Sequence, residues 1–261
     1  MRLRVFSVRT VALLAASLLL SVSFLWAQQA PIIEEGEIDG ARFTVARPAK
    51  VWNGGLILHA HGYRSEEAPR VADLPVQQRA YAELLSEGWM IATTSYRRNG
   101  LILLDAMKDI DALRKHISET LGEPRIVLLE GESMGGAIVT LLAERDVGVY
   151  AGAIAIGAAL NLRESNGAGG VTLQPRIPLL FLTNQSEMEG PKGYVERATT
   201  EAKLNTSLTP PVLFKVARNG HVNVNQAERL IAFRALLAWI EHGRETLPKP
   251  TPTSAGGVGP V

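Results

Sequence analysis

A serine at the junction between an apolar run and a helix-like segment constrains the fold of this chain more than any other feature. The apolar residues 125–129 precede the motif Gly131-Glu132-Ser133-Met134-Gly135, and helical character begins near Met134. A serine held in so sharp a turn needs small neighbours, because larger side chains would collide with the strand and the helix. Gly131 and Gly135 meet this need, and the motif therefore predicts a nucleophile at Ser133.

Short apolar runs alternate with helix-like stretches along most of the chain. The runs lack the strict alternation of a half-exposed strand, which favours strands buried on both faces. The runs cover residues 56–61, 89–96, 125–130, 151–157, 178–183 and 211–217, and the helix-like stretches cover 73–87, 101–121, 134–145, 191–206 and 225–242. This order predicts an α/β fold with a mostly parallel sheet and helices on both of its faces.

Two further segments, residues 33–38 and 42–46, flank the dipeptide Asp39-Gly40. This dipeptide readily adopts positive φ angles, which predicts an amino-terminal antiparallel hairpin at the sheet edge. The expected sheet then has eight strands, in a catalytic domain over residues 31–245. The segment 247–261 is rich in proline, glycine and threonine and is expected to be a disordered tail.

The amino terminus has the pattern of a secretory signal peptide. Arg2, Arg4 and Arg9 lie before an almost wholly apolar run over residues 11–27. This run of about 17 residues is short for a membrane-spanning helix of roughly 20. We expect residues 1–27 to be removed and the domain to be secreted or periplasmic. The alternative is an uncleaved membrane anchor, which also places the domain outside the cytoplasm.

The composition argues against several other classes of protein. The formal charge of +1 becomes about −2 without the three arginines of the leader, and neither balance favours a nucleic-acid partner. The chain has no cysteine, and disulfides and thiolate metal sites are therefore excluded. We expect no metal and no organic cofactor, and the sequence sets no expectation for the oligomeric state.

A serine hydroxyl needs a neighbouring base, and His221 is the best placed of the five histidines. It follows the last predicted strand and precedes the closing helix, at the same carboxyl edge of the sheet as Ser133. His116 falls within a helix and His242 at a helix end, where structural roles are expected. The alternative for His221 is an ordinary surface-loop histidine.

The base in turn needs an acceptor for its second ring nitrogen, to fix the tautomer and to stabilise the imidazolium. The apolar run 178–183 opens into a loop that contains Glu187 and Glu189. Glu187 is the first candidate, Glu189 the second, and Asp146 a distant third. Both glutamates can also be read as solvated loop acids.

Acyl transfer further requires donors for the developing oxyanion. The amide of Met134, at a helix start, is the expected first donor, and the amide of Tyr63 the second. His61 and Gly62, in the same loop as Tyr63, are expected to contact the substrate. A His-Gly pair after a strand is also compatible with a simple tight turn.

In order and spacing these motifs resemble the α/β-hydrolase fold family, over about residues 33–242. The resemblance implies that the loop at His61 is the oxyanion loop, that Ser133 is the nucleophile, and that Glu187 and His221 are the triad acid and base. Glu187 departs from the commoner aspartate, and Glu132 stands where histidine is frequent.

The loop Tyr96-Arg97-Arg98-Asn99-Gly100 also resembles a family feature, one that usually braces the site. Alternatively, Arg97 or Arg98 binds a carboxylate of the substrate.

Together the motifs predict an exported serine hydrolase that cleaves carboxylic esters through an acyl-enzyme. The glycine-rich residues 158–177 are too few for a large helical cap, which favours an open site for small or polymeric esters. A peptidase of the same fold would share every one of these residues. A non-catalytic binding protein on the same scaffold is the rival from another class.

Overall fold

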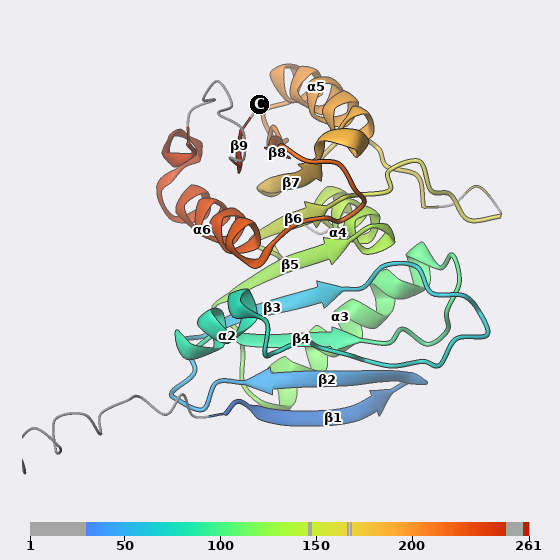
Figure 1. The fold of residues 1–261 in the computed structure, drawn as a ribbon, viewed down its shortest axis with the longest axis vertical. Coiled ribbons are helices and arrows are strands. Elements are labelled where there is room, and N and C mark those ends of the chain that lie inside the picture. Colours follow the sequence, from blue (N-terminus) through green and yellow to red (C-terminus); the bar gives the residue numbers. More distant parts are fainter. Residues whose placement is uncertain (1–29, 146–147, 166, 168, 249–257, 261) are drawn as a thin grey trace, which may run out of the picture. The chain divides into compact units, whose positions relative to one another are not determined.

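A nine-stranded sheet with the order β1-β2-β4-β3-β5-β6-β7-β8-β9 forms the centre of the fold (Figure 1). The computed structural model describes residues 30–145, 148–165, 167, 169–248 and 258–260, so that the predicted leader and Asp146 lie outside the described residues. The strands are β1 (Ile32–Ile38), β2 (Ala41–Arg47), β3 (Gly55–Ala60), β4 (Met90–Thr94), β5 (Ile126–Glu132), β6 (Gly152–Ile156), β7 (Leu179–Asn184), β8 (Val212–Val216) and β9 (Val258–Pro260).

Strands β3 to β8 are parallel, whereas β1, β2 and β9 pair antiparallel with their neighbours. The predicted hairpin is confirmed, with Asp39 at φ 48° and Gly40 at φ 82°. Its register pairs Ile38 with Ala41, which leaves a two-residue turn. The mostly parallel sheet with an antiparallel start is therefore as the sequence predicts.

The ninth strand was not predicted. β9 pairs with β8, with Val258 opposite Val216, inside the segment 247–261 for which the sequence predicts disorder. Leu247 also packs against the core. The strand has three residues among prolines and glycines, and its pairing depends on the free edge of β8 rather than on a local pattern.

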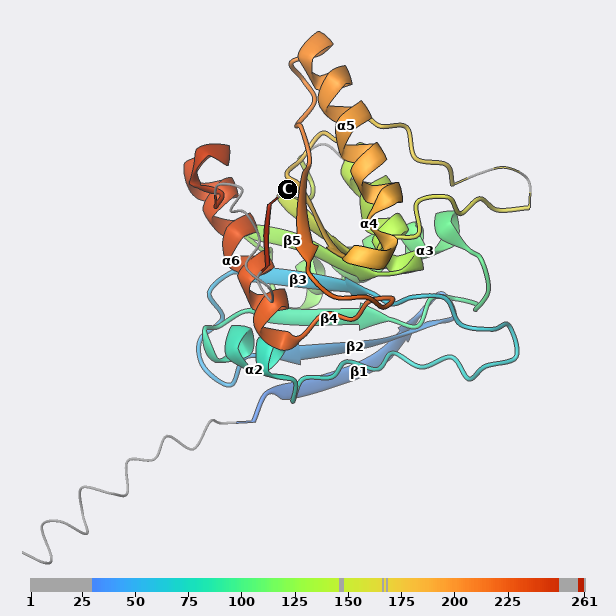
Figure 2. The ribbon, with the colours of Figure 1, turned by 45° about the horizontal axis from the view of Figure 1, so that its top comes forward.

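The helices cover both faces of the sheet (Figures 1 and 2). Helices α2 (Arg79–Ser86) and α6 (Gln226–His242) pack on one face, and α3 (Leu103–Thr120), α4 (Met134–Arg145) and α5 (Glu189–Leu204) pack on the other. Each face has its own apolar core, because successive strand residues point to opposite sides of the sheet. No helix in the described part of the chain is long and apolar enough to cross a membrane.

Helix α2 begins later than predicted. The sequence suggests helix from residue 73, but residues 73–78 form a loop, and the helix starts at Arg79. Pro75 lies in this loop, and proline disfavours the helical conformation of the residue before it. The other four helices begin and end within two residues of the expected bounds.

Candidate active site

Ser133 lies in a tight turn between β5 and α4, at the carboxyl edge of the sheet. Its φ of 56° is in the left-handed region, which a serine adopts only when the surrounding structure holds it there. The Ser133 amide donates to the carbonyl of Ile156 at 2.9 Å, and the amide of Ala159 donates to the Ser133 carbonyl at 3.0 Å. The turn is thus fastened to the end of the neighbouring strand β6.

Two glycines allow helix α4 to approach the sheet at this turn. A Cβ on Gly135 would lie 1.9 Å from the carbonyl oxygen of Ala60 in β3. A Cβ on Gly131 would lie 2.2 Å from the carbonyl oxygen of Gly135. Both clashes are with backbone atoms, which cannot rotate away, and larger residues at these positions would displace the serine.

His221 connects the serine to a carboxylate. Its Nε2 lies 2.8 Å from Ser133 Oγ, and its Nδ1 lies 2.5 Å from Glu187 Oε2. The carboxylate can only accept, so Nδ1 carries the proton and Nε2 is free to accept one from the serine hydroxyl. The side chain of His221 is 59% exposed, and the imidazole therefore faces solvent.

Glu187 reaches the histidine from the short helix η1 (Gln185–Glu187), directly after β7. Its second carboxylate oxygen accepts from the amide of Val222 at 3.3 Å. Val222 has φ 53°, a strained angle for a β-branched residue, and this angle points its amide at the carboxylate. Glu189 is exposed at the start of α5.

The loops of the acid and the base are joined by a set of hydrogen bonds that the sequence analysis missed. The buried side chain of Asn184 accepts from the amide of Asn223 at 2.8 Å and donates to its carbonyl at 2.9 Å. Ser186 and Gly220 also exchange hydrogen bonds, at 2.9 and 3.1 Å. Asn184 is the last residue of β7 and belongs to no recognisable motif, so that sequence reasoning had no signal for it.

The loop after β3 lies against the serine. A Cβ on Gly62 would be 3.4 Å from that of Ser133, and Tyr63 follows Gly62 directly in the sequence. Met134 is the first residue of α4, and a first-turn amide has no acceptor within its own helix. This end of the helix is suited to a developing negative charge. The side chain of Tyr63 is 59% exposed.

From the sequence, His61 is expected to contact the substrate, but the structure buries its side chain. It is 7% exposed and packs on Tyr96, with ring centroids 4.1 Å apart. Its Nδ1 lies 2.7 Å from the carbonyl oxygen of Gly62, and this contact stabilises the loop after β3. Burial, followed by the nearby Arg64, lowers the pKa of His61 to about 4, so the ring is neutral near pH 7.

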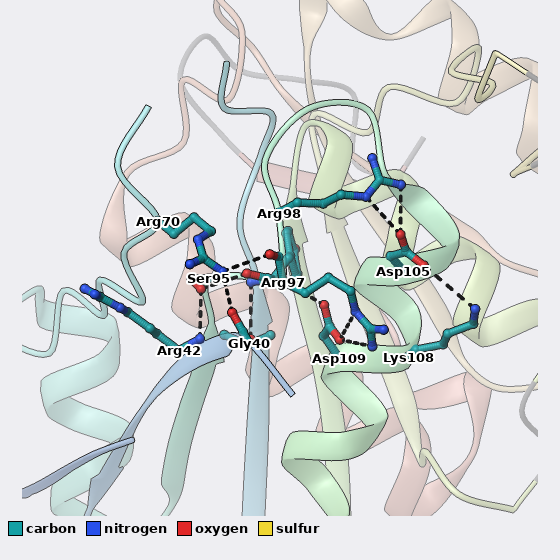
Figure 3. Close-up of polar contacts among 11 residues, drawn as sticks. Gly40, Arg42, Arg70, Ser95, Arg97, Arg98, Asp105, Lys108 and Asp109 are labelled. Atoms are coloured by element: carbon teal, nitrogen blue, oxygen red, sulfur yellow. Dashed lines mark hydrogen bonds and ion pairs between the residues drawn. The ribbon is translucent and has the colours of Figure 1, made fainter. Parts of the chain in front are cut away.

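Arg97 is the expected alternative contact for a substrate carboxylate, but in the structure its guanidinium is bound to a carboxylate of the protein itself. Figure 3 shows its guanidinium directed at Asp109 of α3, with Nε 2.9 Å from the carboxylate. Asp109 is 3% exposed and raises the pKa of Arg97 through this hydrogen bond. Arg98 in turn pairs with Asp105, at 2.8 Å. The contacts of both arginines are those of the bracing alternative.

The same close-up shows how this bracing extends to the hairpin (Figure 3). Arg70 donates to the carbonyls of Gly40 at 2.6 Å and of Arg97 at 2.9 Å. The amide of Arg42 donates to Ser95 Oγ at 3.0 Å. The loops at the carboxyl ends of β3 and β4 are therefore tied to the edge hairpin.

A second polar cluster, with no counterpart in the sequence analysis, includes Glu132, the residue directly before the serine. It consists of His59, Tyr81, Glu130, Glu132 and Arg229, and we call it the Arg229 cluster. Among residues 30–145, 148–165, 167, 169–248 and 258–260, no group of three or more His, Cys, Asp or Glu side chains is arranged to hold a metal ion.

Comparison with known proteins identifies the fold. No family model matches the chain, and no curated protein matches it in sequence. Among solved structures, an esterase of Pyrobaculum calidifontis has a TM-score of 0.56 and 14% identity, over 92% of this chain and 95% of its own. A puromycin-hydrolyzing peptidase of Mycobacterium tuberculosis has a TM-score of 0.62 and 12% identity, over 88% of this chain.

An acylaminoacyl peptidase of Pyrococcus horikoshii has a TM-score of 0.58 and 9% identity. This chain spans less than half the length of the two peptidases, 42% and 43%. These proteins share the α/β-hydrolase fold, and so does this chain. Identities this low establish the fold alone.

Proposed function

We propose that the protein is a serine hydrolase that cleaves carboxylic esters through an acyl-enzyme. The observation that supports this best is the continuous hydrogen-bonded chain from Ser133 through His221 to Glu187. Serine, base and acid come from loops after three different strands, and such convergence has no structural purpose in a scaffold that only binds. The esterases and peptidases that share the fold are consistent with a hydrolase.

In the proposed mechanism, His221 Nε2 takes the proton of Ser133 Oγ as the hydroxyl oxygen attacks the ester carbonyl. The amides of Met134 and Tyr63 hold the oxyanion, and each such donor contributes about 3 to 4 kcal/mol. The imidazolium, stabilised by Glu187, then protonates the leaving alcohol. Water repeats the sequence on the acyl-enzyme, and Ser133 is regenerated.

An ester is the preferred substrate because an alcohol leaves more readily than an amine. A peptidase that recognises a free amino terminus would also need carboxylates not otherwise engaged. Glu187 is engaged by His221, which leaves the exposed Glu189. The exposure of His221 further supports an open site that accepts bulky or polymeric esters. A peptidase of the same fold is the second candidate, because peptidases are among the structures that share it.

We also propose that the protein is exported, with residues 1–27 as a cleaved signal peptide. The basic start and the apolar run of residues 11–27 support this. Mass spectrometry of the protein from a secreting host should give an amino terminus near residue 28 or 31. An intact leader in the membrane fraction would favour the anchor instead.

A fluorophosphonate probe tests the hydrolase directly. We expect the wild-type protein to be labelled and Ser133→Ala to be unlabelled, while the control Ser207→Ala, at an exposed serine, labels normally. A panel of p-nitrophenyl esters and aminoacyl p-nitroanilides then separates esterase from peptidase. Absence of labelling and of turnover in the wild type would favour a non-catalytic binding protein.

A further inference from the structure

The Arg229 cluster lies on the face of the sheet that α2 and α6 cover, because Tyr81 belongs to α2 and Arg229 to α6. Glu130 and Glu132 are two residues apart on β5, and residues with this spacing point to the same face of a sheet. Ser133 follows Glu132 directly. The last side chain of β5 before the proposed nucleophile therefore belongs to this cluster.

Arg229, on α6, forms ion pairs with both Glu130 and Glu132. The other oxygen of Glu130 accepts from the Tyr81 hydroxyl at 2.6 Å and lies 2.7 Å from His59 Nδ1. Burial lowers the pKa of His59 to about 4, so the ring is neutral and donates to the carboxylate. Each of the five side chains in the Arg229 cluster thus has at least one partner of suitable chemistry, although Arg229 Nε itself makes no hydrogen bond within the described residues.

The cluster is almost completely enclosed. Glu130 is 0% exposed and Arg229 is 4% exposed, whereas the side chain of Glu132 is 30% exposed. Transfer of a guanidinium and a carboxylate out of water is costly, and apolar packing of similar volume usually stabilises a fold at least as well. Beyond Arg229 along the chain, the buried residues of α6 are all apolar: Ala232, Phe233, Ala235, Leu236 and Trp239. Stability alone therefore does not explain an arginine here.

Its position relative to the active site offers an explanation. Arg229 lies in the first turns of α6, four residues after Asn225, which caps the helix, and eight after His221. At its other end it holds Glu132, adjacent to Ser133. One guanidinium thus connects the strand that presents the serine to the helix that follows the base.

We propose that Arg229 is a positioning residue for the hydrolase, one that sets the register between Ser133 and His221 by clamping Glu132 and Glu130 to α6. This inference rests on the proposed function. Arg229 contacts neither of the reacting side chains; it acts through Glu132 and the start of α6. Because proton transfer depends on a distance of 2.8 Å, a small shift between the two elements lowers turnover more than substrate binding.

The test replaces Arg229 with Met, which keeps length and removes charge, and with Lys, which keeps charge and cannot clamp two carboxylates. A fluorophosphonate probe counts competent sites in each purified variant, and kcat is expressed per labelled site. We expect Arg229→Met to lower kcat per site by about 10- to 100-fold with KM within about 3-fold. Arg229→Lys should recover part of the loss.

The matched control is Arg234→Met. Arg234 lies on the same helix and also pairs with two carboxylates, Glu83 and Glu87, but its side chain is 42% exposed and neither carboxylate lies on β5. It should retain wild-type kcat per site. A purely structural role for Arg229 predicts fewer labelled sites with normal turnover at each, and that outcome would overturn the proposal.

A second variant covers the case in which Arg229→Met does not fold. Glu132→Gln leaves the buried pair of Arg229 with Glu130 intact and alters a partly exposed side chain, so the fold should persist. We expect kcat per site to fall by about 5- to 20-fold, again with little change in KM. Wild-type turnover in Glu132→Gln would contradict the inference. If instead the wild type is neither labelled nor active, the proposed function fails and not this inference alone.

Discussion

Glu187 and Glu189 are two residues apart, yet of the two it is Glu187 that meets His221. Glu187→Gln keeps the shape of the side chain but offers an amide to Nδ1, which favours the wrong tautomer of the base. We expect kcat for a p-nitrophenyl ester to fall by about 10²- to 10⁴-fold, with KM nearly unchanged. The control Glu189→Gln should stay within about 2-fold of wild type. Equal losses in both variants would show that the acid has been misassigned.

Single residues were predictable where each follows an apolar run at the same edge of a sheet. Ser133, Glu187 and His221 were found in this way, and the structure brings the three together. Asn184 and Arg229 were not found, because their partners lie tens of residues away and share no pattern with them. Contacts of this kind exist only once the strands are in register.

At the scale of elements, the close packing of α4 on the sheet depends on Gly135. A Cβ there would meet the carbonyl of Ala60 at 1.9 Å, and Gly135→Ala must therefore push the helix and the strand β3 apart. We expect a loss of about 1 to 3 kcal/mol or more in the free energy of unfolding, measured with urea, and a loss of probe labelling at Ser133.

Gly193 provides the matched control on α5, where a Cβ would meet no atom within 4 Å. Gly193→Ala should raise the free energy of unfolding by about 0.5 to 1 kcal/mol, because alanine is the better helix former. Labelling should be normal. A Gly135→Ala protein as stable and as reactive as wild type would contradict the close packing described here.

Elements were predictable where burial leaves a plain signal in the sequence. The strands buried on both faces appear as short apolar runs, and α3 shows its apolar residues at helical spacing. The start of α2 and the whole of β9 were missed. The first depends on where a loop ends after Pro75, and the second on an edge that β8 presents only in the assembled sheet.

At the scale of the whole molecule, the strand order could not be derived from the sequence. The chain places β3 between β4 and β5, so that β2 pairs with β4 and skips its sequence neighbour. Alternation of strands and helices predicts a parallel sheet but does not say on which side each new strand is added. The order nevertheless determines the site, because it sets the ends of β3 and β5 next to each other.

Stability of the whole molecule should depend on pH through two buried histidines at the end of β3. Burial lowers the pKa values of His59 and His61 from 6.5 to about 4 in the folded protein. Between these values the unfolded chain binds protons that the folded chain does not. The free energy of unfolding is therefore highest above pH 6.5, falls as pH decreases towards 4, and levels off below.

The fall between pH 7.5 and pH 5.0 should be about 2 kcal/mol for each histidine, measured by urea unfolding at the two values. His61→Gln lowers the free energy of unfolding at both pH values, because the ring packs on Tyr96. The difference in unfolding free energy between pH 7.5 and pH 5.0 should, however, be smaller in this variant than in the wild type by about 2 kcal/mol. His242→Gln, at an exposed position at the end of α6, serves as the control and should keep the wild-type difference. If His61→Gln also kept the wild-type difference between the two pH values, His61 would have to be protonated in the folded protein at pH 5. The conclusion that a neutral His61 supports the loop at Gly62 would then be wrong.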